Sequence, residues 1–209
     1  MTRTLSPAVV SLVTLTALLA GVAGAATPAG PVVGTWATYQ WSSSLRQDVP
    51  VLIRQDQPGG QPTFTLARDS VPPAPLFATY AIVRADPKTY TMQITTHASA
   101  DGPPLSVTQV QVDRASGKAV RTVIKAPKGA IATPDSGFRA YQQAAVKGTE
   151  EAVAVPAGRF TAVKTTAQNG TVWVSDQVPA LGLVKGTFPS GTLELLRSGT
   201  SGAKDLLRS

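Results

Sequence analysis

The sequence predicts a mainly β protein, an antiparallel sandwich or barrel with one short helix. Two observations carry this prediction. Short β-branched and aromatic segments recur along the chain, and glycines and prolines separate them at turns. The pattern is clearest over residues 151–197, where single Pro and Gly residues can only be corners between consecutive strands.

The first 25 residues predict a signal peptide with a short helical, apolar centre. Arg3 precedes the apolar run 9–19, and small residues continue to Ala25. The run is shorter than the roughly 20 residues that span a bilayer, so a cleaved signal is favoured over a membrane anchor. We expect cleavage before Ala26, export to the periplasm or the exterior, and a soluble product. The 184 residues that remain of 209 after 25 are removed suit one β domain, 26–209.

The composition restricts the chemistry. The chain has no cysteine, so an exported product is held by its core without disulfides, and thiolate catalysis and Cys-ligated metals are excluded. The net charge is +7, and its excess lies in the C-terminal half: residues 114–209 hold 13 basic and 6 acidic side chains. The basic residues are scattered singly without interleaved aromatics, which favours a solvated surface over a face that meets an anionic partner such as lipid headgroups or a cell-envelope polymer, and no nucleic-acid binding is expected.

Strands are expected wherever apolar or β-branched residues alternate between turns. In the first, Ala37, Tyr39 and Trp41 share one face. The fourth is apolar on both faces, and the fifth alternates strictly, which places His97 on a polar face. The expected strands are 34–42, 49–54, 62–67, 76–84, 90–97, 105–113, 119–125, 151–155, 160–166, 172–175, 183–188 and 192–197.

The connections follow from Pro, Gly and Asn. Residues 72–75 are rich in proline and form a loop, and Gly117 sits in the turn of the hairpin 105–125. The apolar phase slips between Val107 and Val110, which predicts a bulge. Residues 126–134 are expected to be loop, 136–147 form the one helix, and Asn-Gly at 169–170 forms a two-residue turn.

The last third of the chain resembles small exported bacterial proteins of uncharacterised function that are related to the lipoprotein carriers LolA and LolB. The residues that carry the resemblance are turns and core positions: Pro156, Gly158, Phe160, Trp173, Pro179, Gly182 and Lys185. The resemblance implies a single curved antiparallel sheet that forms a half-open barrel, closed on one side by a helix. Its apolar cavity accepts acyl chains in the carriers. Only residues 136–147 can supply that helix, which is shorter than the helical lid of the carriers.

The sequence offers few candidate functional residues. His97, the only histidine, has no charge partner in its surroundings and reads as a surface residue. The acidic residues fall at turns or, as with Glu150 and Glu151, on opposite faces of a strand, so no carboxylate pair for hydrolysis emerges. No catalytic, metal-binding or cofactor motif is present. Aromatic side chains at strand positions are the remaining candidates for a lipid or carbohydrate site, although a buried core is the default explanation for them: Trp36, Tyr39, Trp41, Tyr80 and Trp173.

These observations favour an exported, non-enzymatic β protein that binds a hydrophobic or lipid group on its concave face and needs no cofactor. Two alternatives stay open. One is an accessory subunit of an envelope or secretion assembly that docks on proteins or an anionic surface through a sheet edge or the basic C-terminal half. The other is a carboxylate hydrolase, which requires two acids within about 10 Å.

Overall fold

The computed structural model describes residues 31–44, 47–55, 63–71, 74–126, 129–133, 148–167 and 170–208. The predicted signal peptide, 1–25, and the predicted helix, 136–147, lie outside these residues.

The described chain forms strands and turns and contains no helix. The expected strands are all present, most with bounds shifted by one to three residues. In order they are β1 (Trp36–Ser43), β2 (Gln47–Gln55), β3 (Thr63–Val71), β4 (Leu76–Ala85), β5 (Thr89–His97), β6 (Pro104–Asp113), β7 (Ala119–Ala126), β8 (Gly129–Thr133), β9 (Thr149–Val155), β10 (Gly158–Ala167), β11 (Gly170–Val174), β12 (Leu183–Phe188) and β13 (Gly191–Gly199).

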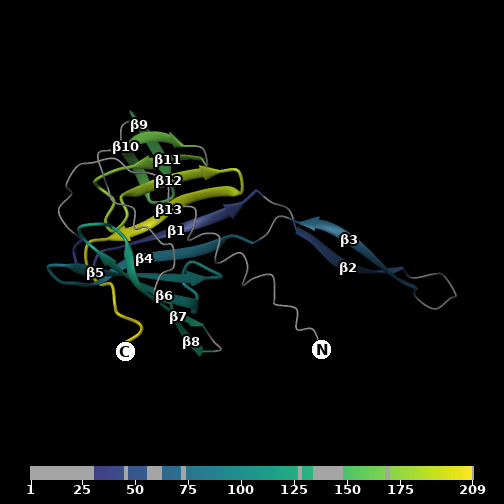
Figure 1. Cartoon of the computed structure of the whole chain (residues 1–209). Coiled ribbons are helices and arrows are strands. Elements are labelled where there is room, and N and C mark those ends of the chain that lie inside the picture. Colours follow the sequence, from purple (N-terminus) through teal and green to yellow (C-terminus); the bar gives the residue numbers. More distant parts are fainter. Residues whose placement is uncertain are drawn as a thin grey trace.

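Eleven of these strands make one antiparallel sheet in the order β8-β7-β6-β5-β4-β1-β13-β12-β11-β10-β9 (Figure 1). The predicted antiparallel sheet is therefore confirmed. It is not closed into a barrel, because β8 and β9 at its two ends do not pair with each other. The β9–β10 end curls back over the sheet: β9 approaches β12 and β13, and the Ala157 amide donates to the Leu195 carbonyl at 3.1 Å.

The remaining two strands, β2 and β3, form a separate hairpin that projects from the sheet as an arm (Figure 1). They pair with each other along their whole length, from Gln47 opposite Val71 to Gln55 opposite Thr63. The arm is inserted between two strands that are themselves hydrogen-bonded neighbours, because β1 and β4 pair directly as far as Trp41 opposite Leu76.

One face of the sheet carries the hydrophobic core. Ala37, Tyr39 and Trp41 of β1 share this face as predicted, and they are matched by Leu193 and Leu195 on β13. The core continues over β5 and β6 on one side and over β10 to β12 on the other. Alternation with a period of two therefore places apolar side chains on this face along the greater part of the sheet.

Two predicted details were wrong. Residues 126–134 were expected to be loop, but β8 pairs there with β7 from Ala126 opposite Gly129 to Thr122 opposite Thr133. The expected bulge between Val107 and Val110 is absent, since β6 keeps its register with β5 through both positions. Val107 is buried on the opposite face instead, so the apolar run reflects burial on both faces.

The turns of the last third use the residues that the resemblance singled out. Pro156 and Ala157 make the turn between β9 and β10, and Gly158 follows with a φ of 131°. Pro179 lies in the loop between β11 and β12, which ends at Gly182 with a φ of 68°. These positive φ values favour glycine because they crowd any side chain against the backbone.

Candidate functional site

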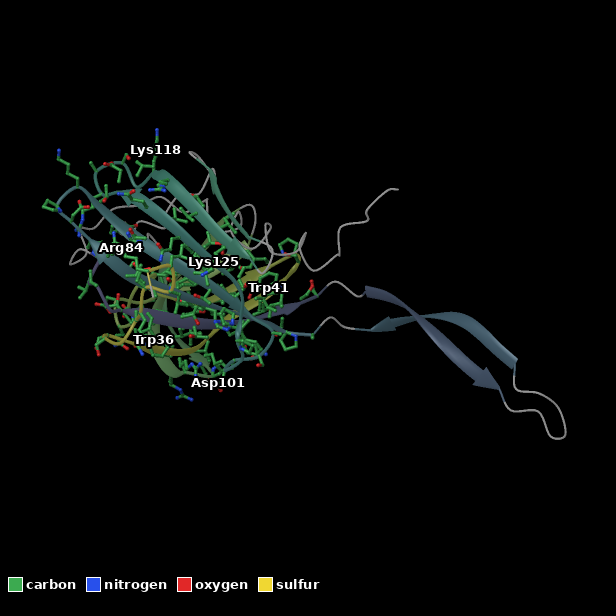
Figure 2. All side chains as sticks on the ribbon, turned by 90° about the horizontal axis from the view of Figure 1, so that it is seen from below. Trp36, Trp41, Arg84, Asp101, Lys118 and Lys125 are labelled. Atoms are coloured by element: carbon green, nitrogen blue, oxygen red, sulfur yellow. The ribbon has the colours of Figure 1, made fainter. Side chains whose placement is uncertain are left out.

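The five aromatic candidates do not line one cavity. Tyr39, Tyr80 and Trp41 lie on the core face, and Trp173 on β11 packs partly against the same core, whereas Trp36 lies on the opposite face of β1, called the polar face below. Figure 2 shows Trp41 at the end of the sheet from which the arm leaves and Trp36 toward the other end of the same strand. The structure therefore offers two separate candidate sites.

The centre of the core face is filled by the two tyrosines. Tyr39 and Tyr80 meet edge to face with ring centroids 5.7 Å apart, and both are at most 1% exposed. The Tyr39 hydroxyl donates to the Leu183 carbonyl at 2.9 Å. Burial, with a smaller contribution from Tyr80, raises the pKa of Tyr39 well above its usual range, and burial does the same to Tyr80. The pair is neutral and well packed, as core tyrosines are.

The rim of the core face is more open. Trp41 is half-buried and packs on Phe188 with ring centroids 6.0 Å apart and a tilt of 37°. Further along the rim, Tyr90 and Phe160 are also only partly buried against the core. Apolar side chains at the edge of this core thus remain in reach of a ligand.

The polar face holds a groove of about 250 Å³ beneath the end of the chain. Residues 200–208, here called the C-terminal strap, cross this face next to β1, β4, β5 and β6. The groove lies between the strap and the sheet. Its sheet residues are Trp36, Thr79, Ala81, Gln93, Thr95 and His97, and its strap residues are Gly202, Ala203, Lys204 and Leu206.

Two buried glutamines organise the polar face beside this groove. Gln93 on β5 and Gln109 on β6 are 3% and 5% exposed, and the Gln109 amide nitrogen donates to Gln93 Oε1 at 3.0 Å. Arg84 Nη2 donates to Gln109 Oε1 at 2.6 Å, and the Gln109 nitrogen also donates to Asp205 of the strap at 2.6 Å. Arg84 Nε lies 2.9 Å from the other Asp205 oxygen. The second N–H of the Gln109 amide therefore has its partner only while the strap is in place.

Asp205 is ionised in this arrangement. Its side chain is 16% exposed. Partial burial alone would raise its pKa, but hydrogen bonds from Gln109 and the Leu207 amide and the charges of Arg84 and Arg208 outweigh that effect and lower the pKa below the usual range.

His97 lies at one end of the groove and is half-buried, not the free surface residue that was expected. Its Nδ1 is 2.8 Å from the Gly102 carbonyl. A carbonyl oxygen only accepts, so His97 Nδ1 donates this hydrogen bond. The bond fixes the ring on the short β5–β6 connection, where it serves as a groove wall.

Glu151 and Glu194 form ion pairs with lysines, and Glu150 is exposed. Glu151 lies 3.7 Å from Lys164 Nζ and accepts a hydrogen bond from the Trp173 indole at 2.5 Å, and Lys164 Nζ sits 5.3 Å from the centre of the Trp173 ring. Glu194 pairs with Lys185 at 2.7 Å. Trp173 is thus held by Glu151 and Lys164 and packs partly against the core.

Two of the described aspartates at turns, Asp86 and Asp113, have hydrogen-bond partners within the turn. Asp86 accepts from the Thr89 hydroxyl and from the Thr89 and Lys88 amides, and Asp113 accepts from the hydroxyl and amide of Ser116. These hydrogen bonds lower the pKa of both carboxyl groups. Both close turns in the manner expected of aspartate.

Within the described part of the chain, no three potential metal ligands come together, and no helix is present that could cross a membrane. No family model, curated protein or solved structure matches the chain. The similarity to the lipoprotein carriers accordingly stays a prediction from the sequence.

Sequence reasoning missed the residues that build the polar face: Arg84, Gln93, Gln109 and Asp205. A signal was present, because Gln93 and Gln109 occupy strand interiors where β-branched residues predominate. A glutamine buried at such a position requires hydrogen-bond partners. On an outer face of the sheet, another segment of the chain must cover the glutamine and supply them.

Proposed function

We propose that the protein is an exported, non-enzymatic binding protein whose curved sheet acts as a half-open barrel and accepts a hydrophobic group, such as an acyl chain, along its core face. The observation that carries the proposal is the partly exposed apolar rim of the core, above all Trp41 against Phe188. Tyr39 and Tyr80 fill the centre, so the rim is the place where a ligand enters.

The non-enzymatic character is supported by the state of the carboxylates. Glu151 and Glu194 each hold a lysine, and Asp205 holds Arg84. An acid–base pair for glycoside hydrolysis needs one carboxyl group with a raised pKa. The resolved pKa shifts of aspartates in this structure are all downward.

The test compares two tryptophans of one strand that lie on opposite faces. The protein is purified from its native host, extracted for lipids, and titrated with a fluorescent fatty acid. Trp41→Ala removes a large apolar contact at the rim and should weaken fatty-acid binding about tenfold or more. Trp36→Ala on the polar face should leave fatty-acid affinity unchanged. A protein that carries no lipid and ignores fatty acids contradicts the proposal.

A second candidate, docking on a partner protein through a sheet edge, is favoured by the arm. Both outer edges of the β2–β3 hairpin are unpaired in the described structure, and an isolated two-stranded hairpin is marginally stable in water. The basic C-terminal half is the weaker docking surface, since Lys164, Lys185 and Arg197 each pair with a carboxylate.

Replacing the arm by a short turn between β1 and β4 tests this candidate. Partner capture from envelope extracts should disappear while fatty-acid binding and the melting temperature of the sheet are kept. If capture survives the replacement, the arm is not the docking element.

A further inference from the structure

The C-terminal strap is held by the sheet in the way that a binding protein holds an extended peptide. The Trp36 indole donates to the Ser201 carbonyl at 2.9 Å, and the Ala203 amide donates to the Gly34 carbonyl at 3.0 Å. Further along, the side-chain amide of Gln93 makes two hydrogen bonds to the strap backbone. Its nitrogen donates to the Lys204 carbonyl at 3.0 Å, and its oxygen accepts from the Leu206 amide at 2.9 Å. These four bonds read backbone groups and do not depend on the strap's side chains.

One strap side chain is read as well. The Asp205 carboxylate lies 2.9 Å from Arg84 Nε and accepts a hydrogen bond from Gln109 Nε2 at 2.6 Å. Within the strap, it also accepts from the Leu207 amide at 3.1 Å. The Gln109 amide donates a charge-assisted hydrogen bond to the carboxylate, which is stronger than a neutral one, and Arg84 adds an ion pair without hydrogen-bond geometry. The site therefore selects an acidic residue at this position.

The fit is incomplete at the neighbouring positions. Gly202 and Ala203 border the groove of about 250 Å³, whose far side is formed by the sheet residues Trp36, Ala81 and Thr95. Small strap residues leave this space open. A peptide with a larger apolar residue at the position of Ala203 would fill the groove and gain the contacts that the strap lacks.

We propose that Gly34, Trp36, Arg84, Gln93 and Gln109 form a peptide-binding site, whose ligand is an extended segment of a partner protein with an apolar residue two positions before an aspartate. The strap occupies this site in cis. A partner segment displaces it by supplying the same backbone groups and carboxylate together with a side chain that fills the groove. The site is on the polar face and is independent of fatty-acid binding at the core face.

The experiment uses the full-length chain with the strap weakened. Asp205→Asn keeps the shape of the side chain and removes its charge, so the tethered strap competes less well at its high effective concentration. The probe is a fluorescein-labelled peptide with the sequence of residues 199–209, and anisotropy reports binding. We expect the Asp205→Asn protein to bind this peptide about tenfold more tightly than the wild type does.

Matched peptides test the two recognition elements. A peptide that carries Asp205→Asn should bind the same protein about tenfold more weakly, because it cannot make the charged contact. A peptide that carries Ala203→Phe should bind about tenfold more tightly, because its ring fills the groove. The indole N–H resonance of Trp36, assigned with Trp36→Phe, should shift in each titration.

Three results would overturn the proposal. The first is that the peptide binds neither protein while circular dichroism shows both to be folded. The second is that the aspartate and asparagine peptides bind with equal affinity. The third is that the Trp36 resonance does not move on saturation. If Asp205→Asn does not fold, the same peptides are titrated into the wild type. In the wild type the affinities are lower, but their order must persist: the Ala203→Phe peptide binds most tightly, the unmodified peptide less tightly, and the Asp205→Asn peptide most weakly.

Discussion

The two faces of the sheet bury side chains by different means. On the core face, Tyr39, Leu193 and Leu195 are almost fully buried among other apolar residues, and their contribution comes from removal of apolar area from water. On the polar face, Gln93 and Gln109 are buried to a similar degree, but only hydrogen bonds to one another, to Arg84 and to the strap make that burial tolerable. Apolar packing stabilises the core face. The polar face is stabilised by hydrogen bonds to the strap, a segment that a peptide ligand can replace.

The largest expected difference between the faces is found on one strand. Leu195→Ala removes a fully buried side chain and should lower the free energy of unfolding by about 2–5 kcal/mol. Its neighbour Glu194 faces the polar side in a partly exposed ion pair with Lys185, so Glu194→Ala should cost only about 0–1 kcal/mol. Urea titrations of both variants measure the difference. Equal losses would mean that the faces are not distinct in energy.

Alkaline pH should weaken the core face. Burial raises the pKa of Tyr90 to about 12 and holds those of Tyr39 and Tyr80 well above their usual range, whereas a tyrosine of the unfolded chain ionises near pH 10. Stability is therefore complete below about pH 10 and falls as pH rises, by about 1.4 kcal/mol per pH unit for each buried tyrosine. Urea titrations between about pH 9 and 11 measure the slope. Tyr39→Phe should reduce it by about one third, and an unchanged slope would refute the assignment.

Breaking the polar network should cost less than a core truncation. Gln109→Leu leaves Arg84, Gln93 and Asp205 short of partners and should destabilise the protein by about 1–3 kcal/mol. It should also accelerate hydrogen exchange of the Leu206 amide, which bonds to Gln93.

Gln111 provides the matched control for this substitution. It lies two residues along the same face of β6 and makes one bond, to Thr89 at 3.0 Å. Gln111→Leu should leave exchange at Leu206 unchanged. If both variants accelerate it equally, the strap does not depend on the network.

Acid should release the strap with the smallest effect of all. The pKa of Asp205 lies below its usual value, so the carboxylate stabilises the fold above the ordinary aspartate pKa of about 4, and the contribution is lost as pH falls through the lower folded value. We expect the Trp36 indole resonance, which reports the bond to Ser201, to change below about pH 4. In Asp205→Asn that change should be missing. Its persistence would assign the transition to another group.

The sequence was sufficient for the strands whose side chains alternate and insufficient where pairing alone makes a strand. Tyr90, Met92 and Ile94 predict β5 and its buried face because their period matches a strand. The strand β8 was missed, since its sequence of Gly, Ala, Ile, Ala and Thr has weak β propensity, and pairing with β7 imposes the extended form.

The candidate sites were harder to predict for a related reason. The strap carries no strand periodicity, and apart from Asp205 its contacts with the sheet run mainly through backbone groups, which leave no mark on residue choice. The bond between Gln93 and the Lys204 carbonyl joins residues 111 positions apart. Trp36 and Trp41 were identified as candidates, but only the register of β1 with its neighbours shows what each face meets.

The insertion of the arm has a consequence for how this chain tolerates change in length. Because β1 and β4 already share a ladder where the arm begins, the sheet stays continuous whatever the hairpin contains. Residues added at the far end of β2 and β3 lengthen the projection without disturbing any pairing in the eleven-stranded sheet. That end is where insertions and engineered tags should be accepted at the least structural cost.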